Sequence, residues 1–152
     1  MNLPVLALSL LMAAPYTEAD ARAYMEAMRK DARRNMSVDP VDGAYFYKLT
    51  TQLKAKRVLE IGTSTGYSGA WFDMALMKSG GKLITLEIDP DRHAEARKNF
   101  EAMGLAPIID ARLCNALVEL PRIEGPFDIV FIDAWKPDEV PIPTSYRITV
   151  DN

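Results

Sequence analysis

The sequence contains one cysteine, one histidine and little excess charge. Because Cys114 is the only cysteine in 152 residues, no intramolecular disulfide can form, and the redox compartment stays undetermined. With His93 as the only histidine, metal sites built from several histidines and cysteines are excluded. A net charge of −3 offers no general attraction to polyanions. We therefore expect no nucleic-acid partner.

Long apolar runs are also scarce. The uncharged apolar stretch at 3–14 is too short to cross a bilayer as a helix, so no stable membrane span is expected. Residues 1–16 have two open interpretations, a signal peptide or an apolar N-terminal arm that packs on the protein. No Lys or Arg precedes the stretch, and the cleavage sites near Ala13 are poor. Both a cytoplasmic and an exported protein therefore stay open.

The remainder, 17–152, shows no internal repeat, low-complexity tract or linker, and we interpret it as one domain. Aliphatic runs predict strands at about 57–61, 83–87, 108–113 and 128–132. Helical spacing predicts helices at about 66–78, 90–103 and 115–120, preceded by amphipathic helices at 17–34 and 41–53. Alternating strands and helices predict an α/β fold with a parallel sheet.

A glycine-rich turn follows the first predicted strand. Gly62 and Gly66 flank three hydroxyl residues, and apolar residues at helical spacing begin directly afterwards. The turn therefore opens a helix whose first amides have no intrahelical partner, and the glycines leave room for a ligand. A Walker-type phosphate loop is excluded because the turn has no lysine. The Gly-x-x-x-Gly-x-x-Gly spacing also differs from the dinucleotide pattern.

Two carboxylates accompany this turn. Glu60 comes two residues before Gly62, which favours a ligand with an amino group over one with a pyrophosphate. Glu87 ends the next predicted strand, where a carboxylate can accept hydrogen bonds from ribose hydroxyls. A nucleoside that carries an amino acid satisfies both. The alternatives are that Glu60 only ties the turn together and that Asp89 only caps the next helix.

Three motifs, at 58–68, 87–90 and 131–136, resemble those of S-adenosylmethionine-dependent O-methyltransferases, in particular the cation-dependent catechol and caffeoyl-CoA type. The resemblance covers roughly 36–138. It implies a Rossmann-like, doubly wound parallel sheet with N-terminal helices. It also implies S-adenosylmethionine as the cofactor and methyl transfer to a hydroxyl oxygen of a small-molecule acceptor. The implied cofactor-binding residues are Glu60, Gly62, Thr63, Ser64, Gly66, Tyr67, Ser68, Glu87, Ile88, Asn115, Ala116 and Asp133.

The resemblance further assigns catalysis to Asp133 and Lys136, with Lys136 as the base toward the acceptor hydroxyl. Asp133 is implied to bind Mg²⁺ or another divalent cation together with an Asp-Asn pair, which Asp151 and Asn152 match. The interval before this pair is shorter than is usual in the family. Two alternatives stay open, namely that Lys136 is a solvated loop residue and that Asn115 caps a helix. Trp71, Tyr67 and the methionines are interpreted as core.

The chain ends before the final strands of the family's sheet, so we expect a C-terminally truncated methyltransferase core. A function of another class is also open, namely a non-catalytic S-adenosylmethionine-binding domain or an inactive fragment whose sheet a partner completes. An unpaired sheet edge invites association, and a homodimer is one expected form. The spacing of the glycine turn disfavours a nicotinamide-dependent oxidoreductase.

Overall fold

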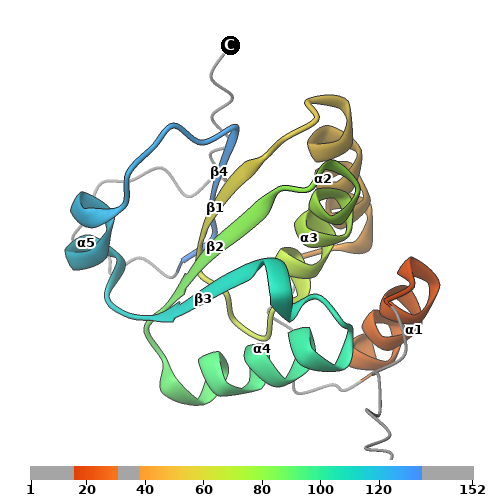
Figure 1. The fold of residues 1–152 in the computed structure, drawn as a ribbon. Coiled ribbons are helices and arrows are strands. Elements are labelled where there is room, and N and C mark those ends of the chain that lie inside the picture. Colours follow the sequence, from red (N-terminus) through yellow and green to blue (C-terminus); the bar gives the residue numbers. More distant parts are fainter. Residues whose placement is uncertain (1–15, 31–37, 135–152) are drawn as a thin grey trace, which may run out of the picture.

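The computed structural model describes residues 16–30 and 38–134, and in this part of the chain four parallel strands form one sheet (Figure 1). The strands are β1 (Arg57–Ile61), β2 (Lys82–Glu87), β3 (Ile109–Leu113) and β4 (Ile129–Ile132), in the spatial order β3-β2-β1-β4. The predicted α/β class is therefore confirmed, and every strand begins and ends within one residue of its predicted bounds.

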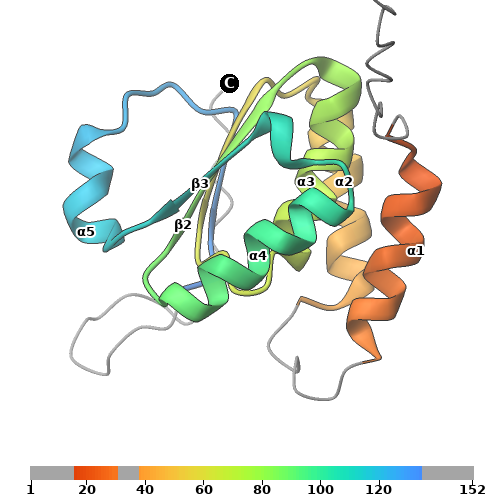
Figure 2. The same ribbon diagram turned by 60° about the horizontal axis from the view of Figure 1, so that its bottom comes forward.

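Helices lie on both faces of this sheet, as Figures 1 and 2 show. On one side are α2 (Pro40–Gln52), α3 (Tyr67–Ser79) and α4 (Pro90–Ala102), with α1 (Glu18–Arg29) beyond them. The short helix α5 (Ala116–Glu119) lies on the other side, and single 3-10 turns occur at η2 (Ala106–Ile108) and η3 (Leu120–Arg122). This arrangement is the predicted doubly wound fold with N-terminal helices.

Short polar side chains begin four of these helices. In each case a side-chain oxygen accepts a hydrogen bond from a backbone N–H of the first turn, which has no partner within the helix. The capping residues are Thr17, Asp39, Asp89 and Asn115. The predicted cap roles of Asp89 and Asn115 are thus confirmed.

One helix end differs from its predicted position by more than one residue, and another helix continues as a different helix type. Helix α1 was predicted to reach about Arg34 but ends at Arg29, with Lys30 as its C-cap. Helix α5 was predicted to reach residue 120, but Pro121 has no N–H for an α-helical hydrogen bond, and the chain continues as the 3-10 turn η3. No helix within 16–30 or 38–134 has the length and apolar character needed to cross a membrane.

The sheet buries different apolar clusters on its two faces. Under α2, α3 and α4, the rings of Phe46 and Phe72 stack with centroids 5.0 Å apart, and Phe131 of β4 lies 4.8 Å from Phe46. The opposite face buries Leu59, Ile61 and Leu86 beneath α5 and its flanking segments. Burial on both faces explains the continuous aliphatic runs of the strands. Trp71 and Tyr67 are only 8% and 3% exposed, which confirms their interpretation as core.

One carboxylate of α3 is buried without a partner. Asp73 has no exposed surface, and neither of its carboxyl oxygens makes a hydrogen bond. Ten consecutive residues of α3, Tyr67 to Leu76, are buried, so the helix has no solvent-facing side at this point. Burial raises the pKa of Asp73 well above its ordinary value, because the ionised form loses its contacts with water.

We predict that Asp73→Asn increases the free energy of unfolding at neutral pH by about 1–3 kcal/mol, because the amide carries no charge to desolvate. Because the pKa of Asp73 is raised in the folded state, the protonated carboxyl stabilises the fold fully at pH values below the unfolded-state pKa of about 3.9. This stabilisation is lost as the pH rises toward the folded-state pKa. The advantage of the variant should therefore grow with pH, as urea unfolding would measure. An equally or less stable variant at neutral pH contradicts this account.

A second polar cluster joins α1 to α2 and α3. The Glu18 carboxylate accepts hydrogen bonds from Arg22 Nη2 at 2.7 Å and Tyr47 Oη at 3.0 Å, and it pairs with Lys78 Nζ at 2.8 Å. The Arg22 guanidinium lies 4.8 Å from the centre of the Trp71 ring. Partial burial alone would raise the pKa of Glu18, but hydrogen bonds from Lys78, Arg22 and Tyr47 outweigh it and lower the pKa to about 2.

We predict that Glu18→Gln lowers the free energy of unfolding at neutral pH by about 1 kcal/mol, a value reduced for the partial exposure of the pair. Because the pKa of Glu18 is lowered in the folded state, the ionised carboxylate stabilises the fold at pH values above the unfolded-state pKa of about 4.3. This stabilisation is lost as the pH falls toward 2. Glu26→Gln is the matched control, because Glu26 is 67% exposed and lies 4.0 Å from Arg29. Equal losses in both variants would contradict the role of Glu18.

Candidate functional site

The sheet order locates a candidate site at the carboxyl ends of the strands. The chain passes outward from β1 through β2 to β3 and then returns to the other side of β1 to form β4. Ligands of open α/β sheets bind where the strand order reverses in this way. The loop after β1 and the residues after β4 meet at this point, since Asp133 N donates to Ile61 O at 2.9 Å. The predicted residues Glu60, Glu87, Asn115 and Asp133 therefore lie along one edge of the sheet.

The glycine turn is held by close backbone contacts on two sides. The N–H groups of Gly62 and Thr63 both donate to Leu86 O, at 2.9 and 3.2 Å. On the other side, a Cβ added to Gly62 would lie 2.6 Å from the carbonyl oxygen of Asp133, and the φ angle of Gly62 is +103°. Only glycine fits a position with both features. The absence of a side chain is therefore required here for the crossing of two backbone segments.

The turn ends at the start of α3 without a side-chain cap. Gly66 is the N-cap residue, its φ angle is +86°, and no side chain bonds the first amides of the helix. The Thr65 hydroxyl beside it is buried and has no hydrogen-bond partner. Unpaired amides and the helix dipole favour an anionic group at such a helix start.

Glu87 fixes the turn against the end of β2. It is 7% exposed, and its Oε2 accepts a hydrogen bond from Ser64 N at 2.7 Å. Its Oε1 accepts from Ile88 N and Asp89 N, both at 3.0 Å. The sequence predicted ribose hydroxyls as partners of this carboxylate, and it did not identify the Ser64 amide. An ionised carboxylate offers about four acceptor positions, so three amide bonds leave capacity for a ligand hydroxyl.

Glu60 lies deeper and contacts hydroxyl groups. It is fully buried, and it accepts hydrogen bonds from Ser68 Oγ at 2.5 Å and Thr85 Oγ1 at 2.6 Å. Thr85 Oγ1 also lies 2.6 Å from Thr63 Oγ1. Burial raises the pKa of Glu60 to about 7. Hydrogen bonds from Ser68 and Thr85 oppose this rise, and nearby negative charges add to it. Both carboxylate oxygens thus point to hydroxyls within the protein, and a direct ligand contact stays a prediction.

Thr85 was not identified from the sequence as a partner of Glu60. The two residues are paired in the register of β1 with β2, which cannot be read from either strand alone. A signal was nevertheless present, because Thr85 interrupts the aliphatic part of an otherwise apolar strand. A hydroxyl at a fully buried strand position needs a hydrogen-bond partner.

Apolar side chains are exposed beside the ends of β2 and β3. Ile88, a predicted site residue, is 66% exposed, and Leu113 and Leu117 are 50% and 79% exposed. Asn115 lies between the last two, and its Oδ1 accepts from Leu117 N at 3.0 Å. Glu87 and Leu113 are register partners, so Ile88 and Leu113 lie at neighbouring strand ends and offer exposed apolar surface there. Leu113 and Leu117 were not identified from the sequence, because apolar residues in a strand or a helix are usually core.

The remaining predicted residues fall into two groups. The side chains of Thr63, Tyr67 and Ser68 are buried, Ala116 is partly buried and Asp133 is exposed. Lys136, Asp151 and Asn152 lie outside the described residues, so their predicted roles are untested. Within 16–30 and 38–134, no three or more His, Cys, Asp or Glu side chains gather where they could hold a metal ion.

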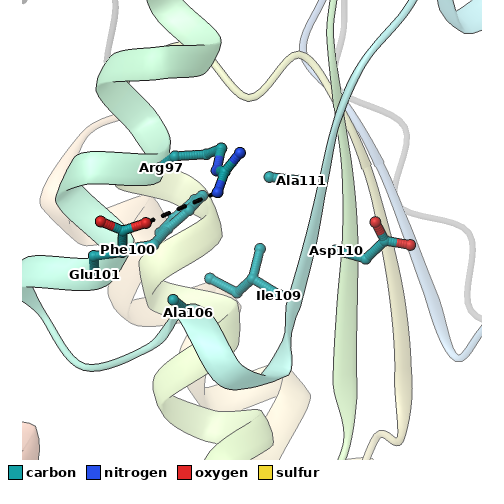
Figure 3. A pocket seen from close by; sticks show the side chains of 7 residues that line it. All are labelled: Arg97, Phe100, Glu101, Ala106, Ile109, Asp110 and Ala111. Atoms are coloured by element: carbon teal, nitrogen blue, oxygen red, sulfur yellow. Dashed lines mark ion pairs between the residues drawn. The ribbon is translucent and has the colours of Figure 1, made fainter.

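A hollow of about 240 Å³ lies elsewhere, between α4 and β3 (Figure 3). Ile109, the first residue of β3, lines it, whereas the candidate site lies beyond the other end of that strand. Arg97 and Glu101 form an ion pair of 3.9 Å across its rim. The hollow is therefore separate from the glycine turn.

The strand order, the glycine turn and the acidic residue that ends β2 define a Rossmann-like α/β protein. Residues 16–146 match the sequence model of the O-methyltransferase family, and the chain belongs to that family. It is 43% identical over 106 residues to a catechol O-methyltransferase from Niastella koreensis, a match that covers 67% of this chain and 48% of the relative. The chain spans about half the length of the curated relatives it matches.

Solved structures agree with this assignment. An O-methyltransferase from Bacillus cereus in complex with SAH is 29% identical, with a TM-score of 0.67 over 82% of this chain and 57% of that protein. The O-methyltransferase TomG from Streptomyces achromogenes in complex with SAM is 30% identical, with a TM-score of 0.66 over 82% of this chain and 56% of that protein. The family resemblance of the three sequence motifs is thereby confirmed.

We predict that Gly62→Ala destabilises the protein by more than about 2 kcal/mol, because the Cβ would require a strained φ angle and would collide with the Asp133 backbone. Gly80→Ala is the matched control. Gly80 also has a positive φ angle, +70°, but its Cβ would meet only Lys56 Nζ at 4.0 Å, so the cost should be about 1 kcal/mol. Urea unfolding of both variants measures the difference, and equal losses would show that the contact with Asp133 is unimportant.

Proposed function

We propose that this chain forms the cofactor-binding part of an S-adenosylmethionine-dependent methyltransferase whose acceptor is a hydroxyl oxygen of a small molecule. The observation that carries the proposal is the position of Glu87, whose carboxylate is fixed by Ser64 N at 2.7 Å beside the glycine turn. The family assignment and the SAH and SAM complexes of the structural relatives support it.

The residues present fit this cofactor. Its carboxylate suits the uncapped start of α3, where the buried Thr65 hydroxyl also lacks a partner. Its ribose hydroxyls suit the remaining acceptor capacity of Glu87. Its base suits the exposed apolar side chains of Ile88 and Leu117. When bound, the cofactor supplies an activated methyl group on a sulfonium.

The chemistry would depend on residues after β4. Methyl transfer requires that the acceptor oxygen be held in line with the methyl group and lose its proton. We assign proton removal to Lys136 and metal binding to Asp133 together with Asp151 and Asn152. An exposed carboxylate such as Asp133 is a suitable oxygen ligand for Mg²⁺ or another divalent cation. A non-catalytic cofactor-binding domain is the second candidate, because the contacts at Glu87 and at the start of α3 bear on cofactor binding alone.

Calorimetry with S-adenosylhomocysteine tests the binding part of the proposal. We predict that Glu87→Ala weakens binding by about 1–3 kcal/mol, because a charged hydrogen-bond acceptor is lost. Glu101→Ala is the control, since Glu101 lies on α4 at the separate hollow and is 62% exposed. Tighter binding of NAD than of S-adenosylhomocysteine would overturn the proposal. A methylation assay with catechol and Mg²⁺ then distinguishes the catalytic candidate from the non-catalytic one.

A further inference from the structure

The hydroxyl groups around Glu60 allow only one assignment of protons when this carboxylate is ionised. Ser68 Oγ donates to Oε1 at 2.5 Å, and Thr85 Oγ1 donates to Oε2 at 2.6 Å. Each hydroxyl has one proton, so the 2.6 Å contact between Thr63 and Thr85 must be donated by Thr63. The protons of Ser68 and Thr85 therefore point to Glu60, and the proton of Thr63 points to Thr85.

This arrangement affects the start of α3, because Ser68 lies in the first turn of that helix. With its proton donated to Glu60, the Ser68 hydroxyl offers only lone pairs to a ligand. A ligand carboxylate, which the helix start otherwise favours, would face an acceptor where it needs a donor. If Glu60 takes one proton from solvent, its acid group donates to Ser68 Oγ. The Ser68 proton is then free to turn toward the ligand.

The surroundings of Glu60 make this proton uptake accessible near neutral pH. Desolvation by burial is the main reason that the pKa of Glu60 is raised to about 7. The charged groups that act on it are Asp133, after β4, and Glu87, at the end of β2, and both disfavour a second negative charge. From α3, Gly69 would place a Cβ 3.1 Å from Glu60 Oε2 and 3.2 Å from the apolar ring of Phe100 on α4.

We propose that Glu60 is a positioning residue that takes up a proton when the carboxylate end of the ligand binds at the start of α3, and that it acts through the Ser68 hydroxyl. This inference rests on the proposed function, because it requires a ligand that carries a carboxylate. It gives Glu60 a role in binding that needs no contact between its own side chain and the ligand.

Calorimetry of S-adenosylhomocysteine binding in buffers of different ionisation enthalpy counts the protons taken up. Between about pH 7 and 8 we expect the native chain to take up a substantial fraction of a proton, with affinity falling by up to about tenfold per pH unit above the pKa of the free protein. Glu60→Gln should bind without uptake, because its amide permanently supplies one donor and one acceptor. Ser68→Ala should bind more weakly and also lose the uptake.

Asp73→Asn is the matched control, since Asp73 is another buried carboxylate of raised pKa on α3, and its variant should retain the uptake. Thr85→Val provides a second test should Glu60→Gln fail to fold, because loss of a donor to Glu60 should raise the pH at which affinity declines. Binding without uptake, or unchanged uptake in Glu60→Gln, overturns the role of Glu60. Absence of binding in every variant, the native chain included, instead overturns the proposed function.

Discussion

The burial of Glu60 is the constraint on which the candidate site depends. A carboxylate with no access to water must obtain its hydrogen bonds inside the protein, and Glu60 obtains them from Ser68 of α3 and Thr85 of β2. These bonds join the strand before the glycine turn to the helix after it and to the neighbouring strand. The turn between them is therefore fixed at both ends. A preformed loop loses less conformational entropy when a ligand binds.

The two carboxylates of the site differ in what surrounds them, and this separates their roles. Glu60 contacts hydroxyl groups, which can reverse their donor direction when a proton arrives. Glu87 contacts the backbone amides of Ser64, Ile88 and Asp89, which can only donate. Burial among hydroxyls tolerates the neutral form of an acid. The first carboxylate is therefore suited to a change of protonation, whereas the second fixes the backbone of the turn.

The fold could be predicted from the sequence to the extent that its signals are local. Helical spacing identified the helices that Asp39 and Asp89 cap, and aliphatic runs identified all the described strands. The hydroxyl partner Thr85 was missed because it depends on strand register, a non-local property. The burial of Asp73 could not be predicted from the sequence either, because a single acidic residue in a helix normally lies on the solvent face. The burial of α3 depends on non-local packing, because this helix contacts α1, α2 and β2.

Cofactor binding and chemistry are assigned to different parts of the sheet. The residues proposed to hold the cofactor lie between Glu60 and Leu117, around the carboxyl ends of β1, β2 and β3, and Asp133 is the one exception. Those assigned to the acceptor reaction begin at Asp133, directly after β4. On the face opposite α3, the strand residues Ile84, Val130 and Ile132 are only partly buried, so this face is less completely covered than the other. The core under α2, α3 and α4 also includes Phe131 of β4, and Asp133 N donates to Ile61 O directly before the glycine turn. The segment after β4 therefore meets the cofactor-binding part at the turn itself.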